Sequence, residues 1–283
     1  MIFSTDWINH NGALVRSGTP VLTAGNRGFR YGDGLFETLL VKNGRIRLGN
    51  HHFDRLFGGL GVLRFVLPPH FTRESLETQI LELCRRNGHP ALARVRLVVF
   101  RAEGGLYDPV SLHPHYLIES WPLTGADTGL NANGLVIDVY PDGIKSCDAL
   151  ANLKSNNFLL YVLAALYAKE HRLNDCLVLN NHQRLADSTI ANLFLVKDGQ
   201  VHTPPLSEGG VAGVMRRFLL TAMPAAGFPI REEPVTAEDL LDANEVFLTN
   251  AIKGIRWVGT FRTTCYTNTL STTIYNQLIK EVE

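Results

Sequence analysis

Two hydrophobic periods alternate along this chain, and together they restrict it to a fold with both helices and strands. Residues 72–87 place apolar side chains at the i, i+4, i+7 and i+8 spacing of one helix face (Leu76, Ile80, Leu83 and Cys84). Residues 94–100 instead begin with the polar–apolar alternation of a strand. The turn signal Lys42-Asn43-Gly44-Arg45 lies between two apolar runs and predicts a hairpin. We therefore expect a helix capped by Thr72, with strands before and after it.

A second region with the same mixture follows a stretch rich in turn-forming residues. Residues 124–134 are predicted to connect a smaller N-terminal α/β domain, 1–123, to a larger C-terminal domain, 135–283. In the second domain we expect strands at 135–140, 177–179, 192–196 and 245–249, with a tight hairpin turn at 197–200. Residues 157–169 are apolar almost all round and predict a buried helix, and residues 215–226 predict another. Thr236 is expected to cap a further short helix. The predicted fold class is thus mixed α and β.

Composition excludes several classes of protein. The chain has 283 residues, about the length of two domains, and 45% of them are hydrophobic, which is enough for a large core. Its 27 basic and 27 acidic residues give no net charge, so we expect neither nucleic acid nor a membrane surface as a partner. No apolar run is long enough to span a bilayer, and no signal peptide is recognisable. The four cysteines form no C-x-x-C pair, so we expect a cytoplasmic protein without a metal site.

Two polar residues near predicted apolar segments are candidates for a catalytic or cofactor-binding role, and each also has a purely structural interpretation. Lys154 follows the apolar Leu150 and Leu153 at the entry to the predicted helix 157–169. Desolvation there favours the neutral amine, which is a nucleophile toward carbonyls; the alternative is a solvated lysine at a helix end. Asp187 lies between two predicted strands, where it suits a protonated ring nitrogen or is simply a loop acid.

Two further segments suit an anion. The glycines of 209–213 precede the predicted helix start at Val214 and Met215, where main-chain N–H groups and the helix dipole favour phosphate. Thr249 and Asn250 follow a predicted strand and offer a hydroxyl and further N–H groups. The alternatives are an ordinary glycine-rich loop and a capped strand-to-helix turn.

In order and spacing, these segments resemble the class IV aminotransferases, which are pyridoxal-phosphate enzymes of fold type IV. The family includes branched-chain and D-amino-acid aminotransferases and aminodeoxychorismate lyase. The resemblance extends over nearly the whole chain, and it rests on Arg30–Thr38, His51–Leu56, Asp187, Thr189, Asn192-Leu193-Phe194, Val201-His202-Thr203, Val211–Arg216 and Asn250-Ala251.

This resemblance implies how the cofactor, pyridoxal 5′-phosphate, is held: in the cleft between two α/β domains, with Lys154 of the C-terminal domain as the Schiff-base residue. The freed amine of Lys154 then moves the substrate's Cα proton. Asp187 stands where the family usually has Glu, and it is expected to hold the ring nitrogen provided that the ring or the backbone comes closer. Arg55 is expected to bind the phosphate, with main-chain groups near Val214, Met215, Thr249 and Asn250. The alternative for Arg55 is an ion pair with Asp54 or another acid.

The resemblance also suggests substrate contacts and a choice of reactions. Arg101 is expected to meet a substrate carboxylate, and Tyr31 and Glu37 to line the pocket of a homodimer. The first interpretation is an aminotransferase acting on an amino acid and a 2-oxo acid, of either stereochemistry. Leu159 stands where branched-chain aminotransferases usually carry Tyr, whereas Asn157 suits the second interpretation, a lyase that releases pyruvate and 4-aminobenzoate from an aminochorismate for folate synthesis. A catalytically silent protein that binds the cofactor is the third.

Overall fold

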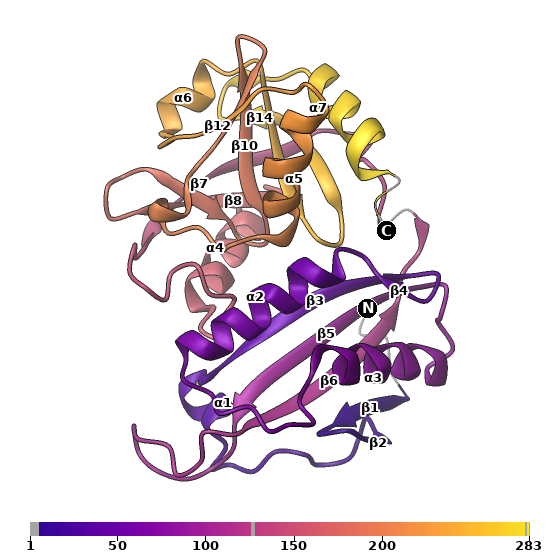
Figure 1. The fold of residues 1–283 in the computed structure, drawn as a ribbon. Coiled ribbons are helices and arrows are strands. Elements are labelled where there is room, and N and C mark those ends of the chain that lie inside the picture. Colours follow the sequence, from indigo (N-terminus) through magenta and orange to yellow (C-terminus); the bar gives the residue numbers. More distant parts are fainter. Residues whose placement is uncertain (1–5, 126–127, 281, 283) are drawn as a thin grey trace. The chain divides into compact units, whose positions relative to one another are not determined.

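The computed structural model describes residues 6–125, 128–280 and 282, which form two compact units (Figure 1). Unit 1 contains the chain up to residue 125 and the four residues Lys154–Asn157. Unit 2 contains Thr128–Leu153 and Phe158–Val282. Residues 1–5 of the predicted N-terminal domain, 126–127 of the predicted connection, and 281 and 283 lie outside the described residues. Although its flanking residues belong to unit 2, the Lys154 segment packs with unit 1, and each unit is described by itself below.

Unit 1 is a six-stranded antiparallel sheet with two long helices. The strand order is β2-β1-β6-β5-β3-β4. Helix α2 packs against β3, and α3 packs against β6 and β1 (Figure 1). Its elements are β1 (Trp7–His10), β2 (Ala13–Arg16), α1 (Arg27–Tyr31), β3 (Gly34–Lys42), β4 (Arg45–Ile46), α2 (Gly49–Val62), α3 (Arg73–Arg86), β5 (Leu92–Arg101) and β6 (Pro114–Pro122).

Local sequence signals in unit 1 act as predicted. Thr72 caps α3 by accepting a hydrogen bond from the Ser75 N–H at 3.2 Å. The helix buries the predicted face, which consists of Leu76, Ile80, Leu83 and Cys84. The predicted hairpin joins β3 to β4, and both of its turn residues, Asn43 and Gly44, have positive φ. The mixed α and β composition of the fold is therefore confirmed.

Unit 2 is built on a larger mixed sheet. The strand order is β12-β11-β10-β13-β14-β7-β8-β9, with β15 paired to β14. The pairs β11–β12, β14–β7 and β7–β8 are parallel and the others are antiparallel. Its elements are β7 (Leu135–Lys145), α4 (Leu159–Glu170), β8 (Asp175–Asn180), β9 (Leu185–Ser188), β10 (Asn192–Lys197), β11 (Gln200–Thr203), the 3-10 turn η2 (Leu206–Glu208), α5 (Val214–Ala225), β12 (Ile230–Glu232), α6 (Ala237–Leu241), β13 (Glu245–Asn250), β14 (Gly254–Phe261), β15 (Thr264–Cys265), α7 (Thr269–Ile274) and the π-turn η3 (Tyr275–Ile279).

The predicted strands, the hairpin and the capped helix of unit 2 are present. Asp198 and Gly199 form the tight turn between β10 and β11. Thr236 caps α6 in a reciprocal capping box with Asp239. Strands β10 and β13 are almost wholly buried and place the stacked rings of Phe194 and Phe247 in the core. These strands position the loops that carry the candidate site residues.

The prediction that residues 157–169 form a buried helix is wrong in one respect. Helix α4 exists, but it buries only the face that contains Tyr161, Ala164 and Ala168, which pack on β7 and β8. A helix on one face of a sheet can bury only one side of itself. The other side is apolar and between 51% and 79% exposed at Leu159, Val162, Leu163 and Leu166. The helix is apolar on almost all sides, but the rest of this chain covers only one of its faces.

Candidate active site

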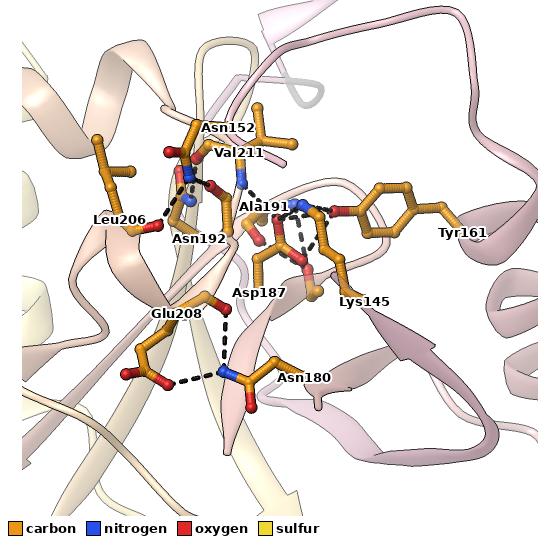
Figure 2. A network of polar contacts seen from close by, with 12 residues as sticks. Lys145, Asn152, Tyr161, Asn180, Asp187, Ala191, Asn192, Leu206, Glu208 and Val211 are labelled. Atoms are coloured by element: carbon orange, nitrogen blue, oxygen red, sulfur yellow. Dashed lines mark hydrogen bonds and ion pairs between the residues drawn. The ribbon is translucent and has the colours of Figure 1, made fainter. Parts of the chain in front are cut away.

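The acid expected at the cofactor's ring nitrogen lies in a buried cluster of unit 2 (Figure 2). Asp187 is on β9 and is 2% exposed. Its carboxylate accepts hydrogen bonds from the Tyr161 hydroxyl at 2.9 Å and from the Val211 N–H at 2.8 Å. Lys145, the last residue of β7, places Nζ 3.3 Å from Asp187 Oδ2 and 2.5 Å from the Tyr161 oxygen. A strand end, a helix and a loop thus hold one carboxylate in place.

The electrostatics of the cluster keep the proton on the Tyr161 hydroxyl. Burial and the negative charge of Asp187 raise the pKa of Tyr161 well above its ordinary value of 10, so the phenol keeps its proton. The hydroxyl therefore donates to Asp187, and its oxygen accepts from Lys145. The pairing of Lys145 with Asp187 and its bond to Tyr161 were not predicted from the sequence. The apolar appearance of the α4 segment concealed Tyr161 as a polar group.

The loop before α5, whose Val211 N–H donates to Asp187, is itself held by the side chains of Asn152 and Asn192 (Figure 2). The Asn152 amide donates to the carbonyls of Leu206 and Gly210 at 2.8 and 2.7 Å. The Asn192 amide donates to the Val211 carbonyl at 2.8 Å. Gly213 approaches Asn192 so closely that a Cβ at residue 213 would lie 1.8 Å from Asn192 Oδ1. The start of α5 is therefore fixed against the start of β10.

The start of α5 and the end of β13 have unsatisfied donors. Gly213 provides no side-chain cap for α5, so the first N–H groups at Val214 and Met215 lack the usual partner. Thr249 on β13 pairs in register with Asn192, is 1% exposed, and its Oγ1 has no hydrogen-bond partner among the described residues. Asn250 differs, because its Oδ1 accepts from the N–H groups of the following turn, including that of Lys253 at 2.8 Å. A buried hydroxyl and an uncapped helix start suit an anion.

Lys154 belongs to a short extended segment beside β3 in unit 1. The Phe36 N–H donates to the Lys154 carbonyl at 2.9 Å, and the Asn156 N–H donates to the Gly34 carbonyl at 3.0 Å. Gly34 permits this approach, since a Cβ there would lie 2.8 Å from the Asn156 amide and 2.2 Å from the Val99 carbonyl. The Lys154 Nζ lies 4.3 Å from the centre of the Phe36 ring. The backbone around the lysine is thus fixed by a motif more than a hundred residues earlier in the chain.

Arg55 on α2 does pair with an acid, but the acid is Glu37 rather than Asp54. Its Nε and one terminal nitrogen contact the two oxygens of Glu37 at 2.8 and 2.5 Å, and His52 Nδ1 lies 2.6 Å from Glu37. Burial alone would raise the pKa of Glu37, but Arg55 and His52 outweigh it and lower that pKa to about 2. Asp54 instead pairs with Arg73.

The same cluster fixes the state of His52. Burial outweighs the attraction of Glu37 and lowers the pKa of His52 below its ordinary 6.5, so the ring is neutral at pH 7. Because the ionised Glu37 only accepts, Nδ1 is the donor. Arg55 and His52 occupy both oxygens of Glu37. This arrangement favours a role for Glu37 in orienting Arg55 over the direct contact with substrate that was expected from the sequence. His52 was missed, although it shares a helix face with Arg55 at the i, i+3 spacing.

Arg101 and Tyr31 belong to a third cluster, in which both terminal nitrogens of Arg101 are occupied while its buried Nε has no hydrogen-bond partner among the described residues. The Arg101 guanidinium is buried, pairs with Asp33, donates to the Leu63 carbonyl, and stacks on Phe65 at 4.2 Å. This ion pair weakens the prediction that Arg101 binds a substrate carboxylate. Tyr31 ends α1 and is half-buried.

Arg27 extends this cluster into the loop after β5. It is buried, contacts Asp33 at 2.9 Å, and donates to the carbonyls of Leu106 and Tyr107 at 2.7 and 3.0 Å. The rings of Tyr31 and Tyr107 lie 6.0 Å apart. The network thus holds the loop against α1, with Tyr31 beside it.

Two further observations concern clusters of metal-ligating side chains and the length of the helices within the described ranges. No group of three or more His, Cys, Asp or Glu side chains there is arranged to hold a metal ion. None of the described helices is both long and apolar enough to cross a bilayer.

Comparison with known proteins gives consistent matches along the chain. Residues 34–260 match the family described as amino-transferase class IV. The aminodeoxychorismate lyase of Vibrio harveyi is 30% identical over 251 residues, which are 88% of each chain. The branched-chain amino acid aminotransferase of Escherichia coli has a TM-score of 0.86 at 21% identity, covering 99% of this chain and 96% of that one. The PLP-bound form of a hypothetical aminotransferase from Mycobacterium tuberculosis has a TM-score of 0.83 at 19% identity, covering 97% of both.

Proposed function

Because this chain belongs to the class IV aminotransferase family and is therefore an enzyme, we propose that it is a pyridoxal-phosphate-dependent aminotransferase. It would transfer an amino group between an amino acid and a 2-oxo acid. The observation that carries the proposal is the buried, firmly held carboxylate of Asp187. A carboxylate at this position can pair with a protonated ring nitrogen, and the charge of that pair is what makes the cofactor ring an effective electron acceptor.

The residues present fit pyridoxal phosphate. The orphaned hydroxyl of Thr249 and the uncapped start of α5 at Val214 and Met215 suit the phosphate. Asn250 would contribute through its main chain, because its side chain is used in the turn. Asp187 suits the ring nitrogen, and Lys154 is proposed to hold the cofactor covalently through its aldehyde. When bound, the cofactor supplies a ring that accepts negative charge from the substrate carbon.

Residues of the chain are proposed to carry out proton transfer, phosphate binding and substrate binding. The Lys154 amine is proposed to remove the Cα proton of the substrate and to return it, as general base and acid. Arg55 is proposed to bind the phosphate, while Glu37 and His52 hold the orientation of its guanidinium. Tyr31 is proposed to donate to the substrate. The substrate role of Arg101 stays a prediction, and so does the cytoplasmic location.

A visible spectrum of the purified protein tests the proposal. Single amino acids are added to the protein saturated with pyridoxal phosphate, and the band of the lysine-bound cofactor is followed. We expect an amino-acid donor to bleach that band, and a 2-oxo acid to restore it. Borohydride reduction followed by peptide mapping should place the cofactor on Lys154. A protein that takes up no cofactor, or that is labelled at Lys145 instead, contradicts the proposal.

A lyase is the second candidate, and a specific observation supports it. The relative from Vibrio harveyi with 30% identity over 88% of both chains is named an aminodeoxychorismate lyase. Such an enzyme would use the same lysine and acid to release pyruvate. Parallel samples with aminodeoxychorismate therefore distinguish the two: pyruvate release without bleaching by any amino acid supports the lyase. Cofactor binding with neither reaction supports a silent binding protein.

We also propose a homodimer formed through the exposed face of α4. Leu159, Val162, Leu163 and Leu166 form an apolar stripe at helical spacing, and Ile144 and Leu150 of the same unit are also more than half exposed. An exposed apolar stripe of this kind on a helix is typical of a subunit interface. A second copy of the chain is the partner that this family resemblance suggests. Light scattering of the wild type and of Leu163→Glu tests it, since the variant should shift to monomer.

A further inference from the structure

We propose that Lys145 is a positioning residue that shares the charge of Asp187 with the cofactor's ring nitrogen, so that this nitrogen holds its proton less tightly. The inference rests on the function proposed above. It concerns a lysine outside the motifs that carry the resemblance, and it starts from three buried groups of unit 2 (Figure 2). Lys145, Tyr161 and Asp187 are 9%, 8% and 2% exposed.

Counting acceptor positions shows that Asp187 can serve Lys145 and a ring nitrogen together. A carboxylate has two oxygens with about four acceptor positions. Oδ2 contacts the Val211 N–H at 2.8 Å and Lys145 Nζ at 3.3 Å. The Tyr161 hydroxyl oxygen lies 2.9 Å from both oxygens of Asp187. Because Val211 and Lys145 already occupy Oδ2, the single hydroxyl hydrogen of Tyr161 is donated to Oδ1. One position on Oδ1 is then left for a ring N–H.

The charges of the cluster give the direction of the effect. Tyr161 keeps its proton and is neutral, because burial and Asp187 raise its pKa. Lys145 and Asp187 form an ion pair, so their charges largely cancel. A protonated ring nitrogen would then be a second cation beside a single carboxylate, and a nearby like charge disfavours protonation. Burial limits the screening of this repulsion by solvent.

Other titratable groups near Lys145 are few and lie on the loop side. Asp148 and Cys147 follow β7 and interact electrostatically with Lys145. Glu208, which is paired with Arg184, acts on Cys147. Glu208 is paired with Arg184, and Asp148 acts on Lys145 from the loop, whereas Asp187 forms the ion pair with Lys145 at 3.3 Å.

The chemistry of the cofactor also gives Lys145 a role different from the one proposed for Lys154. The aldehyde carbon of pyridoxal phosphate is para to the ring nitrogen. A lysine bonded to that carbon must therefore lie a full ring away from the acid that contacts the nitrogen. Lys145 Nζ is 3.3 Å from Asp187, on the acid's side of the ring. Lys145 can tune the nitrogen from there, but it cannot replace Lys154.

The test is a direct measurement of ring protonation in the holoenzyme. The protein is loaded with pyridoxal phosphate labelled with ¹⁵N in the ring, and the nitrogen chemical shift is followed against pH. In Lys145→Met the titration midpoint should rise by at least about one pH unit relative to the wild type. Lys145→Arg keeps the charge and should restore the wild-type midpoint. Lys169→Met removes an exposed lysine of α4 and is the matched control.

Each result separates this inference from the proposed function. An unchanged midpoint in a Lys145→Met protein that is loaded with cofactor overturns the inference and leaves the aminotransferase proposal intact. A wild type that takes up no labelled cofactor overturns the proposed function itself. If Lys145→Met does not fold, as judged by thermal unfolding, Lys145→Gln replaces it with the same expected rise and the same refuting result.

Discussion

Replacing Glu37 with Gln should destabilise unit 1 strongly at neutral pH and weakly in acid. Glu37 is 2% exposed and holds both Arg55 and His52. Its pKa is lowered from 4.5 to about 2, and at about 1.4 kcal/mol per pH unit this corresponds to about 3 kcal/mol of folding free energy. Loss of one partner from a buried ion pair gives a similar cost of roughly 3–5 kcal/mol, since the Arg55 charge stays buried.

The sign of the pH dependence follows from the direction of the shift. A carboxyl whose pKa is lower in the folded state stabilises the fold fully above its unfolded pKa, here about 4.5. That stabilisation is lost as the pH falls from about 4.5 to about 2, where Glu37 becomes protonated in both states. The neutral amide of the Glu37→Gln variant has no charge to lose in this window. The difference in unfolding free energy between wild type and variant should therefore shrink as the pH falls.

Urea unfolding at pH 7, 5, 4 and 3, followed by fluorescence, measures this difference. Glu82→Gln is the control, because Glu82 is an exposed acid on α3 in the same unit. We expect the control to change stability by less than about 0.5 kcal/mol at every pH. If Glu37→Gln costs no more than Glu82→Gln at pH 7, or if its cost does not vary with pH, the reasoning about the buried cluster is refuted.

Three further substitutions, two of them with a comparison variant, test other parts of the structure. Thr249→Val removes a hydroxyl that has no partner among the described residues, so it should leave thermal stability unchanged but weaken pyridoxal phosphate binding by about tenfold or more in a fluorescence titration. Gly34→Ala should cost more than about 2 kcal/mol in urea unfolding, because its Cβ would lie 2.2 Å from the Val99 carbonyl, whereas Gly58→Ala on the exposed side of α2 should stabilise by up to about 1 kcal/mol. Lys154→Ala should abolish borohydride trapping of the cofactor and lower turnover by at least about 100-fold, whereas Lys145→Ala should still be trapped at Lys154.

Elements defined by local signals were predicted well from the sequence. The cap Thr72, the Asn43-Gly44 turn and the capping box at Thr236 each act within a few residues, so their residue types alone specify them. The family resemblance then supplied the candidate acid and lysine. Thr249 was among the residues expected near the phosphate, and its buried hydroxyl has no hydrogen-bond partner among the described residues; its role stays a prediction.

Partners of charged residues were predicted poorly, because they depend on contacts between distant parts of the chain. Arg55 meets an acid 18 residues earlier, on a neighbouring strand, rather than the adjacent Asp54. Arg101 meets Asp33, 68 residues away. A sequence shows which charges exist, but sheet register decides which of them are buried together. The exposed face of α4 is a similar case, since a helix apolar on all sides can be completed by the sheet or by another chain.

The family resemblance leads us to expect Glu at position 187, and the groups that support Asp187 explain how the shorter acid fits there. A shorter side chain keeps the carboxylate near β9, where the Val211 N–H and the Tyr161 hydroxyl reach it at 2.8 and 2.9 Å. One more methylene would carry the carboxylate away from both donors. Lys145 then requires a carboxylate in this position, since a buried ammonium without an acid would be costly. Asp187 is therefore coupled to Tyr161 and Lys145, which lie 26 and 42 residues earlier in the chain. The three side chains form one interacting cluster. The ring nitrogen would contact that cluster rather than an isolated acid.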